Sequence, residues 1–280
     1  HFLESDWAAE QVSGLSYLFF LRKLADAVDN DWDGILKDLE QIHRIFLNRE
    51  AMLVNVTLDE DGWSGFRPGV TDFLDEFPAT GMSPAEWSRK LIPAFEGLTI
   101  PAQVNYVGKG ANLYGEGYRF HGSAQVISRF LRNSYLWDRI RVQGGAYGAF
   151  CLFDRLSGTL TFVSYRDPNL SRTIDVFDKS AAYIRDLELS EDELTKAITG
   201  SIGDLDAHKL PDAKGYTSMV HYLSGETDED RQRMREEILN TTSKDFRAFA
   251  DVLDHVRKDG IVKVLGSRNA VQESLEQNPG

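Results

Sequence analysis

The chain has 280 residues, of which 42% are hydrophobic and 27% are charged, and its net charge is −13. This is an ordinary globular composition. The acidic balance argues against nucleic acid as a partner, because phosphate binding needs a basic surface, and it favours basic peptides instead. No apolar run reaches the roughly 18 residues that a membrane-spanning helix needs, so we expect no membrane partner. The single cysteine, Cys151, excludes an internal disulfide and any zinc site built from several cysteines.

The first part of the chain predicts two helical stretches and then a strand. Asp6–Val28 is helix-like, and Asp31–Asn48 places apolar residues on one helical face. Met52–Leu58 alternates between apolar and other side chains, which is the period of a strand. Glycine, aspartate and serine in Asp59–Gly69 indicate a break, and Pro93–Pro101 is linker-like.

A second block begins at about residue 101 and mixes strands with helices. A hairpin is predicted for Ala146–Phe153 and Thr159–Tyr165, because a five-residue segment containing glycine separates two strand-like runs. Ser190 and Glu193 form a capping box that starts a helix. The other predicted elements are the strands Gln103–Val107 and Ile261–Leu265 and the helices Ser123–Ile140 (with Val126, Phe130, Leu131 and Trp137 available for burial), Leu170–Ile184, Asp212–Leu223, Asp228–Leu239 and Ser243–Arg257, followed by a helical tail.

These elements predict the α+β class, with a mixed or antiparallel sheet that helices cover on one face. The two ends of the chain have a similar organisation, since a helix leads to a short strand at Met52 and again at Ile261. We therefore expect residues 1–65 to be the C-terminal end of one domain, with the order helix, helix, strand. Residues 66–100 are then a linker, and residues 101–280 are a complete second domain of the same kind.

The common catalytic signatures are absent from the sequence. The six histidines are scattered, and none forms the His-x-x-Glu-His or His-Glu-x-x-His spacing that places two imidazoles on one helix face. There is no Gly-x-Ser-x-Gly nucleophile motif. Cys151 lies in an apolar strand-like run, where a structural role is favoured over a nucleophilic one. We expect no metal site in this chain.

One stretch, Leu136–Gly148, combines residue types that could bind a peptide. A helix ends in arginines, Gly144 and Gly145 let the backbone turn, and a strand begins at once. Arg141 offers a fork of donors for carbonyls or carboxylates, and the Tyr147 hydroxyl can donate to an oxygen that gains negative charge. The alternative is purely structural: an arginine that caps a helix, two loop glycines and a tyrosine in the core.

Several multi-residue blocks resemble, in their order, the last part of presequence proteases, which are pitrilysin-type zinc peptidases. These blocks are Pro101–Gly108, Arg141–Gly148, Ser164–Leu170, Leu210–Tyr216 and Thr227–Arg233. The resemblance covers nearly the whole chain and is weakest from about Asp59 to Leu98 and in the tail.

The resemblance implies that this chain is the C-terminal, substrate-binding half of a zinc endopeptidase. Members of the family enclose short unstructured peptides between two halves, and they degrade cleaved targeting presequences in the mitochondrial matrix and the plastid stroma. By resemblance, Arg141 and Tyr147 are catalytic and substrate-binding residues, and Gly144 and Gly145 belong to the same binding element.

In that family the N-terminal catalytic half carries the zinc. Because this chain has no zinc motif, it is expected to be inactive alone and to need that half as its partner. The alternative function is a non-catalytic binding or assembly module with the same fold, since fold does not fix function.

Overall fold

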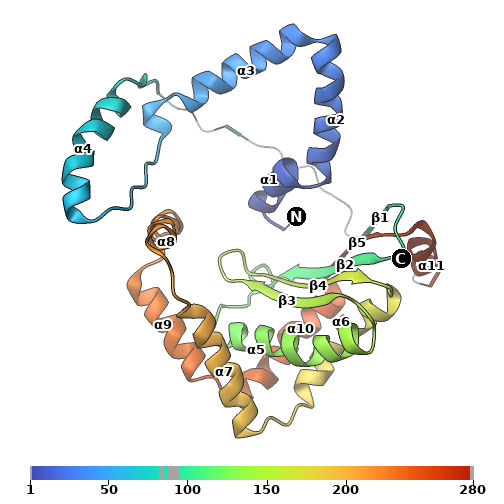
Figure 1. Cartoon of the computed structure of the whole chain (residues 1–280). Helices are drawn as coiled ribbons and strands as arrows, with labels where there is room; N and C mark the ends of the chain where they lie inside the picture. Colours follow the sequence, from blue (N-terminus) through green and yellow to red (C-terminus); the bar gives the residue numbers. More distant parts are fainter. Residues whose placement is uncertain (1, 82, 84, 87–94, 278–280) are drawn as a thin grey trace. The chain divides into compact units, whose positions relative to one another are not determined.

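The chain folds into two compact units in the computed structural model, which describes residues 2–81, 83, 85–86 and 95–277. The first unit contains the described residues of Leu3–Leu91 together with Lys209–Gly225. The second contains those of Ile92–His208 and Glu226–Gly280. Figure 1 shows the first unit in blue and cyan with the orange helix α8, and the second from green to red.

The first unit is helical, and its apolar surfaces are largely uncovered. Its elements are α1 (Glu4–Ser13), α2 (Leu15–Asn30), α3 (Trp32–Phe46), η1 (Arg49–Ala51), α4 (Glu60–Asp75) and α8 (Pro211–Ser224). The predicted apolar face of α3 is present on a helix, but Leu39 is 50% exposed and Phe46 is 72% exposed. None of these elements has a fully buried residue. The helices of this unit thus present apolar side chains that need a further covering surface.

The strand predicted at Met52–Leu58 is wrong for this structure, because the backbone between η1 and α4 is irregular. A strand needs a partner for its backbone N–H and C=O groups, and the described part of the first unit contains no other strand. The predicted break Asp59–Gly69 is also wrong. The Asp59 side chain accepts a hydrogen bond from the Gly62 N–H at 2.7 Å and caps α4, which continues to Asp75.

The boundaries of the predicted linker, residues 66–100, also need correction at both ends. Helix α4 crosses the boundary at residue 65, and β1 (Phe95–Thr99) belongs to the sheet of the second unit. Residues 82, 84 and 87–94, including Pro93, lie outside the described residues. That residues 1–65 are the end of a second, similar domain stays a prediction.

The second unit is built on a five-stranded mixed sheet, as the predicted α+β class requires. The strand order is β1-β5-β2-β4-β3, in which β1 and β5 are parallel and the other pairs are antiparallel. The remaining strands are β2 (Asn105–Asn112), β3 (Gly148–Asp154), β4 (Thr159–Asp167) and β5 (Ile261–Gly266). The predicted hairpin is confirmed as β3 and β4, with Phe150 opposite Val163.

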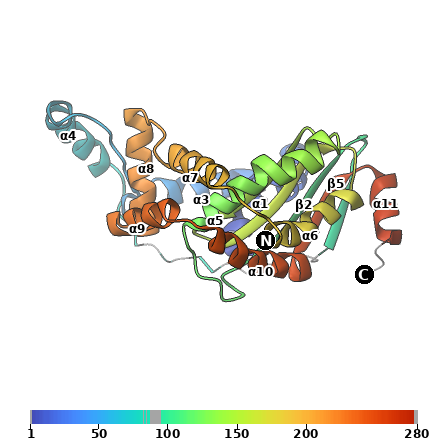
Figure 2. The same cartoon turned by 90° about the horizontal axis from the view of Figure 1, so that it is seen from below.

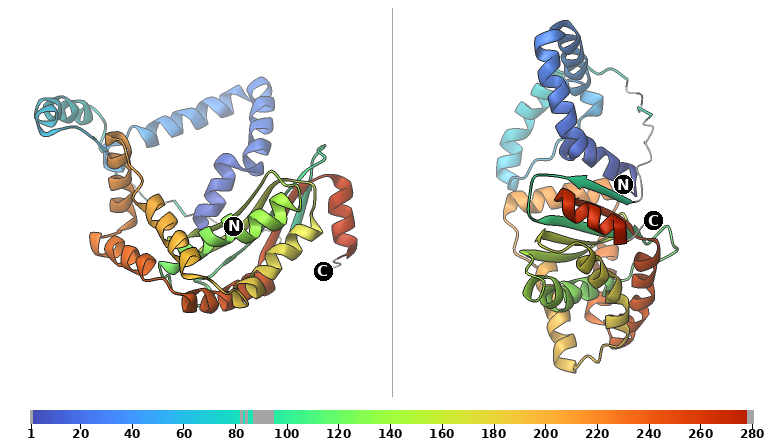
Figure 3. Two further views of the ribbon diagram at one scale, coloured as in Figure 1. Left: turned by 60° about the horizontal axis from the view of Figure 1, so that its bottom comes forward. Right: turned by 90° about the vertical axis from the view of Figure 1, so that its right-hand side faces the viewer.

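Helices cover one face of this sheet. Helices α5 (Ser123–Leu131), α6 (Ser171–Arg185) and α10 (Ser243–Asp259) lie side by side on the same face, as Figures 1, 2 and 3 show from different directions. Helices α7 (Glu191–Leu205) and α9 (Asp228–Leu239) pack near α5, and α11 (Arg268–Gln277) packs against β1. In the core, the Phe162 ring of β4 stacks on the Phe177 ring of α6, with centroids 5.3 Å apart.

A buried lysine ties the sheet to two of these helices. Lys109 of β2 is 6% exposed, and its ammonium group donates to Asp178 of α6 at 2.5 Å and to the Arg257 carbonyl of α10 at 2.9 Å. Burying an ammonium group is costly unless it is paired and hydrogen-bonded, as it is here. The lysine therefore fixes α6 and α10 against the same point of the sheet.

The local signals that start helices in the second unit agree with the sequence. The capping box of Ser190 and Glu193 is confirmed, with the Glu193 carboxylate accepting from the Ser190 hydroxyl at 2.7 Å. Equivalent boxes start α9 at Thr227 and α10 at Thr242. Across the described residues, every helix is too short or too polar to span a membrane.

Candidate functional site

The candidate site begins where helix α5 changes its hydrogen-bonding pattern. From Arg132 to Val142 the helix continues as the π-helical segment η2, and just beyond it the Gln143 N–H donates to the Asp138 carbonyl, five residues earlier, at 2.9 Å. Such segments are rare and occur often at functional sites. The segment packs on β3, the edge strand of the sheet.

Two glycines turn the chain from η2 into β3, as the sequence predicts. Gly145 has φ +79°, a left-handed conformation that glycine adopts without strain. At Gly144 an added Cβ would lie 2.4 Å from the Ile140 carbonyl oxygen, so a larger residue would collide with the helix. The Gly145 N–H donates to the Arg141 carbonyl at 3.0 Å, which closes the end of the helix. The turn therefore places Arg141 and Tyr147 on either side of one sharp bend.

Arg141 projects from the last turn of η2 and is exposed. Its guanidinium carbon lies 4.0 Å from the centre of the Trp137 ring and 6.0 Å from the centre of the Tyr147 ring. A guanidinium over an indole face is held by a cation–π attraction of about 0.5–1 kcal/mol at an exposed site. This contact orients the arginine without occupying its N–H donors.

Tyr147 lies just before β3 and is 67% exposed. Its backbone N–H donates to the Tyr165 carbonyl at 3.1 Å, so its main chain is joined to β4. The Tyr147 ring lies 5.8 Å from the Tyr165 ring, which in turn lies 5.3 Å from the Tyr106 ring of β2, both in edge-to-face arrangements. We call Tyr147, Tyr165 and Tyr106 the tyrosine row.

The structure therefore brings the predicted residues Arg141, Gly144, Gly145 and Tyr147 together. The structural alternative of a core tyrosine is wrong, because two thirds of Tyr147 is exposed. Within the described residues, the side chains of Arg141 and Tyr147 make ring contacts only, so their hydrogen-bonding groups remain available to a ligand. Their roles toward a substrate stay predictions.

Two contributors to the site were missed by the sequence. Trp137 was predicted to be available for burial but is 47% exposed and supports Arg141. The spacing of four residues on one helix could have revealed this pair. Tyr165 reaches Tyr147 only through the pairing of β3 with β4, so no local pattern indicated it.

The described residues contain no cluster of three or more histidine, cysteine, aspartate or glutamate side chains that could hold a metal ion. A zinc site needs three or four such ligands around one point. The side chains described here therefore do not fit a catalytic zinc, and no step of a reaction can be assigned to a metal held by them.

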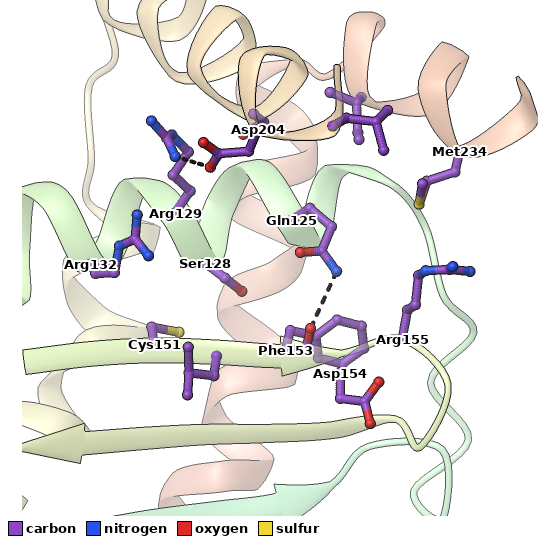
Figure 4. Close-up of a pocket in the computed structure, with 14 residues that line it drawn as sticks. Gln125, Ser128, Arg129, Arg132, Cys151, Phe153, Asp154, Arg155, Asp204 and Met234 are labelled. Atoms are coloured by element: carbon purple, nitrogen blue, oxygen red, sulfur yellow. Dashed lines mark hydrogen bonds and ion pairs between the residues drawn. The ribbon is translucent and has the colours of Figure 1, made fainter. Parts of the chain in front are cut away.

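Separate from this site, a concavity lies on the helix side of the β3 edge, between α5, α7 and α9, with a volume of about 470 Å³ (Figure 4). Two of the arginines that line it form ion pairs, Arg129 with Asp204 and Arg155 with Glu226. Cys151 lies at its floor and is buried. Burial raises the pKa of this thiol to about 12, and the nearby Ser128 hydroxyl and Arg132 charge counteract only part of the effect. Cys151 is therefore a protonated core residue, as its sequence context suggests.

Comparison with known proteins identifies relatives over most of the chain. Residues 95–268 match the family model described as "PreP C-terminal domain". The chain is 48% identical over 264 residues to presequence protease 1, chloroplastic/mitochondrial, of Arabidopsis thaliana. This alignment covers 93% of this chain and 24% of that protein. It is 27% identical over 269 residues to the mitochondrial presequence protease of Eremothecium gossypii, with 90% of this chain and 26% of that protein covered. The chain thus spans about a quarter of the length of these relatives.

Solved structures agree on the fold at low sequence identity. A protease from Helicobacter pylori aligns with a TM-score of 0.54 and 14% identity, over 82% of this chain and 59% of that chain. A peptidase M16 inactive domain from Pseudomonas fluorescens aligns with a TM-score of 0.52 and 13% identity, over 75% of this chain and 51% of that chain. At these identities the likeness concerns the fold alone.

The reactivity of Cys151 tests whether its thiol is buried and protonated in the folded chain. We expect the folded chain to react with a thiol reagent at pH 8 far more slowly than the chain in urea, because only the thiolate attacks and burial disfavours it. Absorbance of released thionitrobenzoate measures both rates. Equal rates in buffer and in urea would contradict the buried, protonated thiol.

Proposed function

Because the chain belongs to the presequence protease family, we propose that it is the C-terminal, substrate-binding part of a peptidase that degrades targeting presequences and other short unstructured peptides. The observation that carries the proposal is the pairing of exposed Arg141 and Tyr147 across the double-glycine turn. Both side chains present unused hydrogen-bond donors beside the uncovered face of the sheet.

Peptide cleavage itself belongs to a longer polypeptide in this proposal. The chain spans about a quarter of its relatives, and the residues described here do not fit a zinc site. The zinc and its ligands would lie in the N-terminal catalytic half, which is the proposed partner. The relatives' names place them in mitochondria and chloroplasts, and we propose the mitochondrial matrix or the plastid stroma for this chain.

The donor groups of Arg141 and Tyr147 suggest that the two side chains bind different parts of the peptide. The Arg141 guanidinium has five N–H donors in a fixed plane, which suit the backbone carbonyls of an extended peptide. Tyr147 has one hydroxyl donor, which suits the oxygen of the scissile carbonyl as that oxygen gains negative charge. The stacking of Arg141 on Trp137 would hold the guanidinium ready before the peptide arrives.

The uncovered face of the sheet would contact the side chains of the peptide. Phe150 and Leu152 of β3 are 39% and 50% exposed, although they lie in the middle of a sheet-forming strand. Val163 of β4 lies opposite Phe150, and Tyr165 continues the same face. Apolar and aromatic contacts without a deep pocket suit many sequences, which a degradative peptidase requires.

The first prediction from this proposed function concerns Tyr147 in the whole enzyme. We expect Tyr147→Phe to lower kcat about 10²–10³-fold with a smaller change in KM, because the lost hydroxyl bond is strongest in the transition state. Arg141→Ala should raise KM and lower kcat together, since backbone contacts exist before and during the reaction. Steady-state kinetics with a fluorogenic peptide measure both.

Melting curves of the same variants separate chemistry from folding. Because Tyr147 is exposed, Tyr147→Phe should leave the Tm unchanged. An unchanged kcat in Tyr147→Phe would remove the proposed catalytic role, and the non-catalytic binding module would become the better account of the chain.

The second prediction is that this chain alone does not cleave peptides, with or without added zinc. The reason is that the described residues lack a set of metal ligands. The same fluorogenic assay on the pure 280-residue chain tests it. Turnover that a chelator abolishes would contradict this division between the two halves.

The third prediction is a preference for basic peptides. The net charge of −13 should attract cationic peptides, and 0.5 M salt should weaken this attraction, because the Debye length is already about 10 Å at 0.1 M. Titration calorimetry with a basic peptide and an acidic peptide of equal length measures the difference. Equal affinities at low salt would rule the preference out.

A further inference from the structure

The backbone of the double-glycine turn is held from outside by one side chain. The Asn169 amide group donates to the Gly144 carbonyl at 2.7 Å. Asn169 lies just after β4, 25 residues beyond Gly144 in the sequence. This hydrogen bond joins the turn that carries Arg141 and Tyr147 to a segment that neither residue belongs to.

Asn169 is itself fixed by Asp167, the last residue of β4. The Asp167 carboxylate is fully buried and accepts hydrogen bonds from the Asn169 backbone N–H at 2.9 Å and from the Thr173 hydroxyl of α6 at 2.7 Å. The Asp167 carbonyl accepts from the Asn105 amide of β2 at 3.1 Å. Asp167 therefore fixes the position of Asn169 relative to the sheet and to the start of α6.

The backbone between Tyr165 and Asp167 is strained at one residue. Arg166 has φ +49°, and it is the one non-glycine residue with positive φ in the described chain. Such conformations cost of order 1–3 kcal/mol and cluster at functional sites. Here the strained residue Arg166 lies between Tyr165, whose carbonyl accepts from the Tyr147 N–H, and Asp167, whose carboxylate accepts from the Asn169 N–H.

We propose that Asn169, held by Asp167, is a positioning residue for Tyr147. The inference rests on the proposed function and adds to it a residue that touches no substrate. A turn of two glycines has more conformational freedom than any other pair of residues, so the site needs an outside constraint to stay in one geometry. A misplacement of about 1 Å at a reacting group can cost about 10²-fold in rate.

The test uses the whole enzyme and the variants Asn169→Ala and Asn169→Asp. Aspartate has nearly the same size as asparagine, but an ionised carboxylate cannot donate to the Gly144 carbonyl. We expect both variants to lower kcat between about 10-fold and about 100-fold, with a smaller change in KM. Asn240→Ala is the matched control, because the Asn240 amide also donates to a backbone carbonyl, that of Glu236 in α9, at 2.9 Å. Because the Asn240 bond is exposed and lies within four residues of the chain, the control should lose less thermal stability than Asn169→Ala, and it should keep its kcat.

A double-mutant cycle decides whether Asn169 acts through Tyr147. In the Tyr147→Phe background, Asn169→Ala should lower kcat less than twofold, because the bond that it positions is already gone. Additive losses of kcat in the double variant would overturn the inference. So would losses of kcat in Asn169→Ala and Asn240→Ala that are both proportional to their losses of Tm.

The cycle also separates this inference from the proposed function. If Tyr147→Phe lowers kcat and Asn169→Ala does not, only the positioning role fails. If Tyr147→Phe leaves kcat unchanged, the proposed role of Tyr147 fails, and the positioning role fails with it.

Discussion

The one-sided burial of the sheet is the constraint on which the rest of the second unit depends. Along β4, Leu160, Phe162 and Ser164 are buried under the helices, while the residues between them are partly exposed on the opposite face. A chain that leaves the helical layer and enters the edge strand β3 must therefore change direction within a few residues. The double-glycine turn makes that change, and the residues on either side of it come to lie at the border of the uncovered face. The location of the candidate site thus follows from how the sheet is covered.

The elements of the second unit were largely predictable because their signals are local. Capping boxes, the hairpin loop and the alternation of strands each depend on residues a few positions apart. Two of the errors concern strands, where a partner decides the outcome. Met52–Leu58 has the alternation of a strand but no neighbouring strand within its own described unit, and β1 forms because β5 lies beside it. Similarly, π-helical bonding in η2 changes the hydrogen-bond partner from four to five residues away, which composition does not reveal.

The candidate site divides in the same way between local and long-range signals. Arg141, Gly144, Gly145 and Tyr147 are neighbours in sequence, and their residue types alone indicated a helix end, a turn and two donors. Tyr165 and Asn169 reach the site through the pairing of β3 with β4 and through the buried Asp167, so their part becomes visible only in the folded chain. The resemblance to presequence proteases assigned roles only to the first group, although the block Ser164–Leu170, which also carries it, contains both residues of the second.

The way in which Arg141 is held explains how an arginine can stay available in so acidic a chain. With 44 acidic residues against 31 basic ones, an exposed guanidinium is readily captured by a carboxylate. Among the described residues, eight other arginines of this unit pair with carboxylates. Four of them do so with residues far away in the sequence, in the pairs Arg129–Asp204, Arg155–Glu226, Arg185–Asp254 and Arg235–Asp206. A carboxylate uses the same in-plane donors that a peptide carbonyl would need. Trp137 instead contacts the face of the Arg141 guanidinium, so the side chain is oriented while its donors stay in solvent. The position at the C-terminal end of η2 adds a favourable interaction between the positive charge and the helix dipole, which stabilises a cation that forms no ion pair with the described residues.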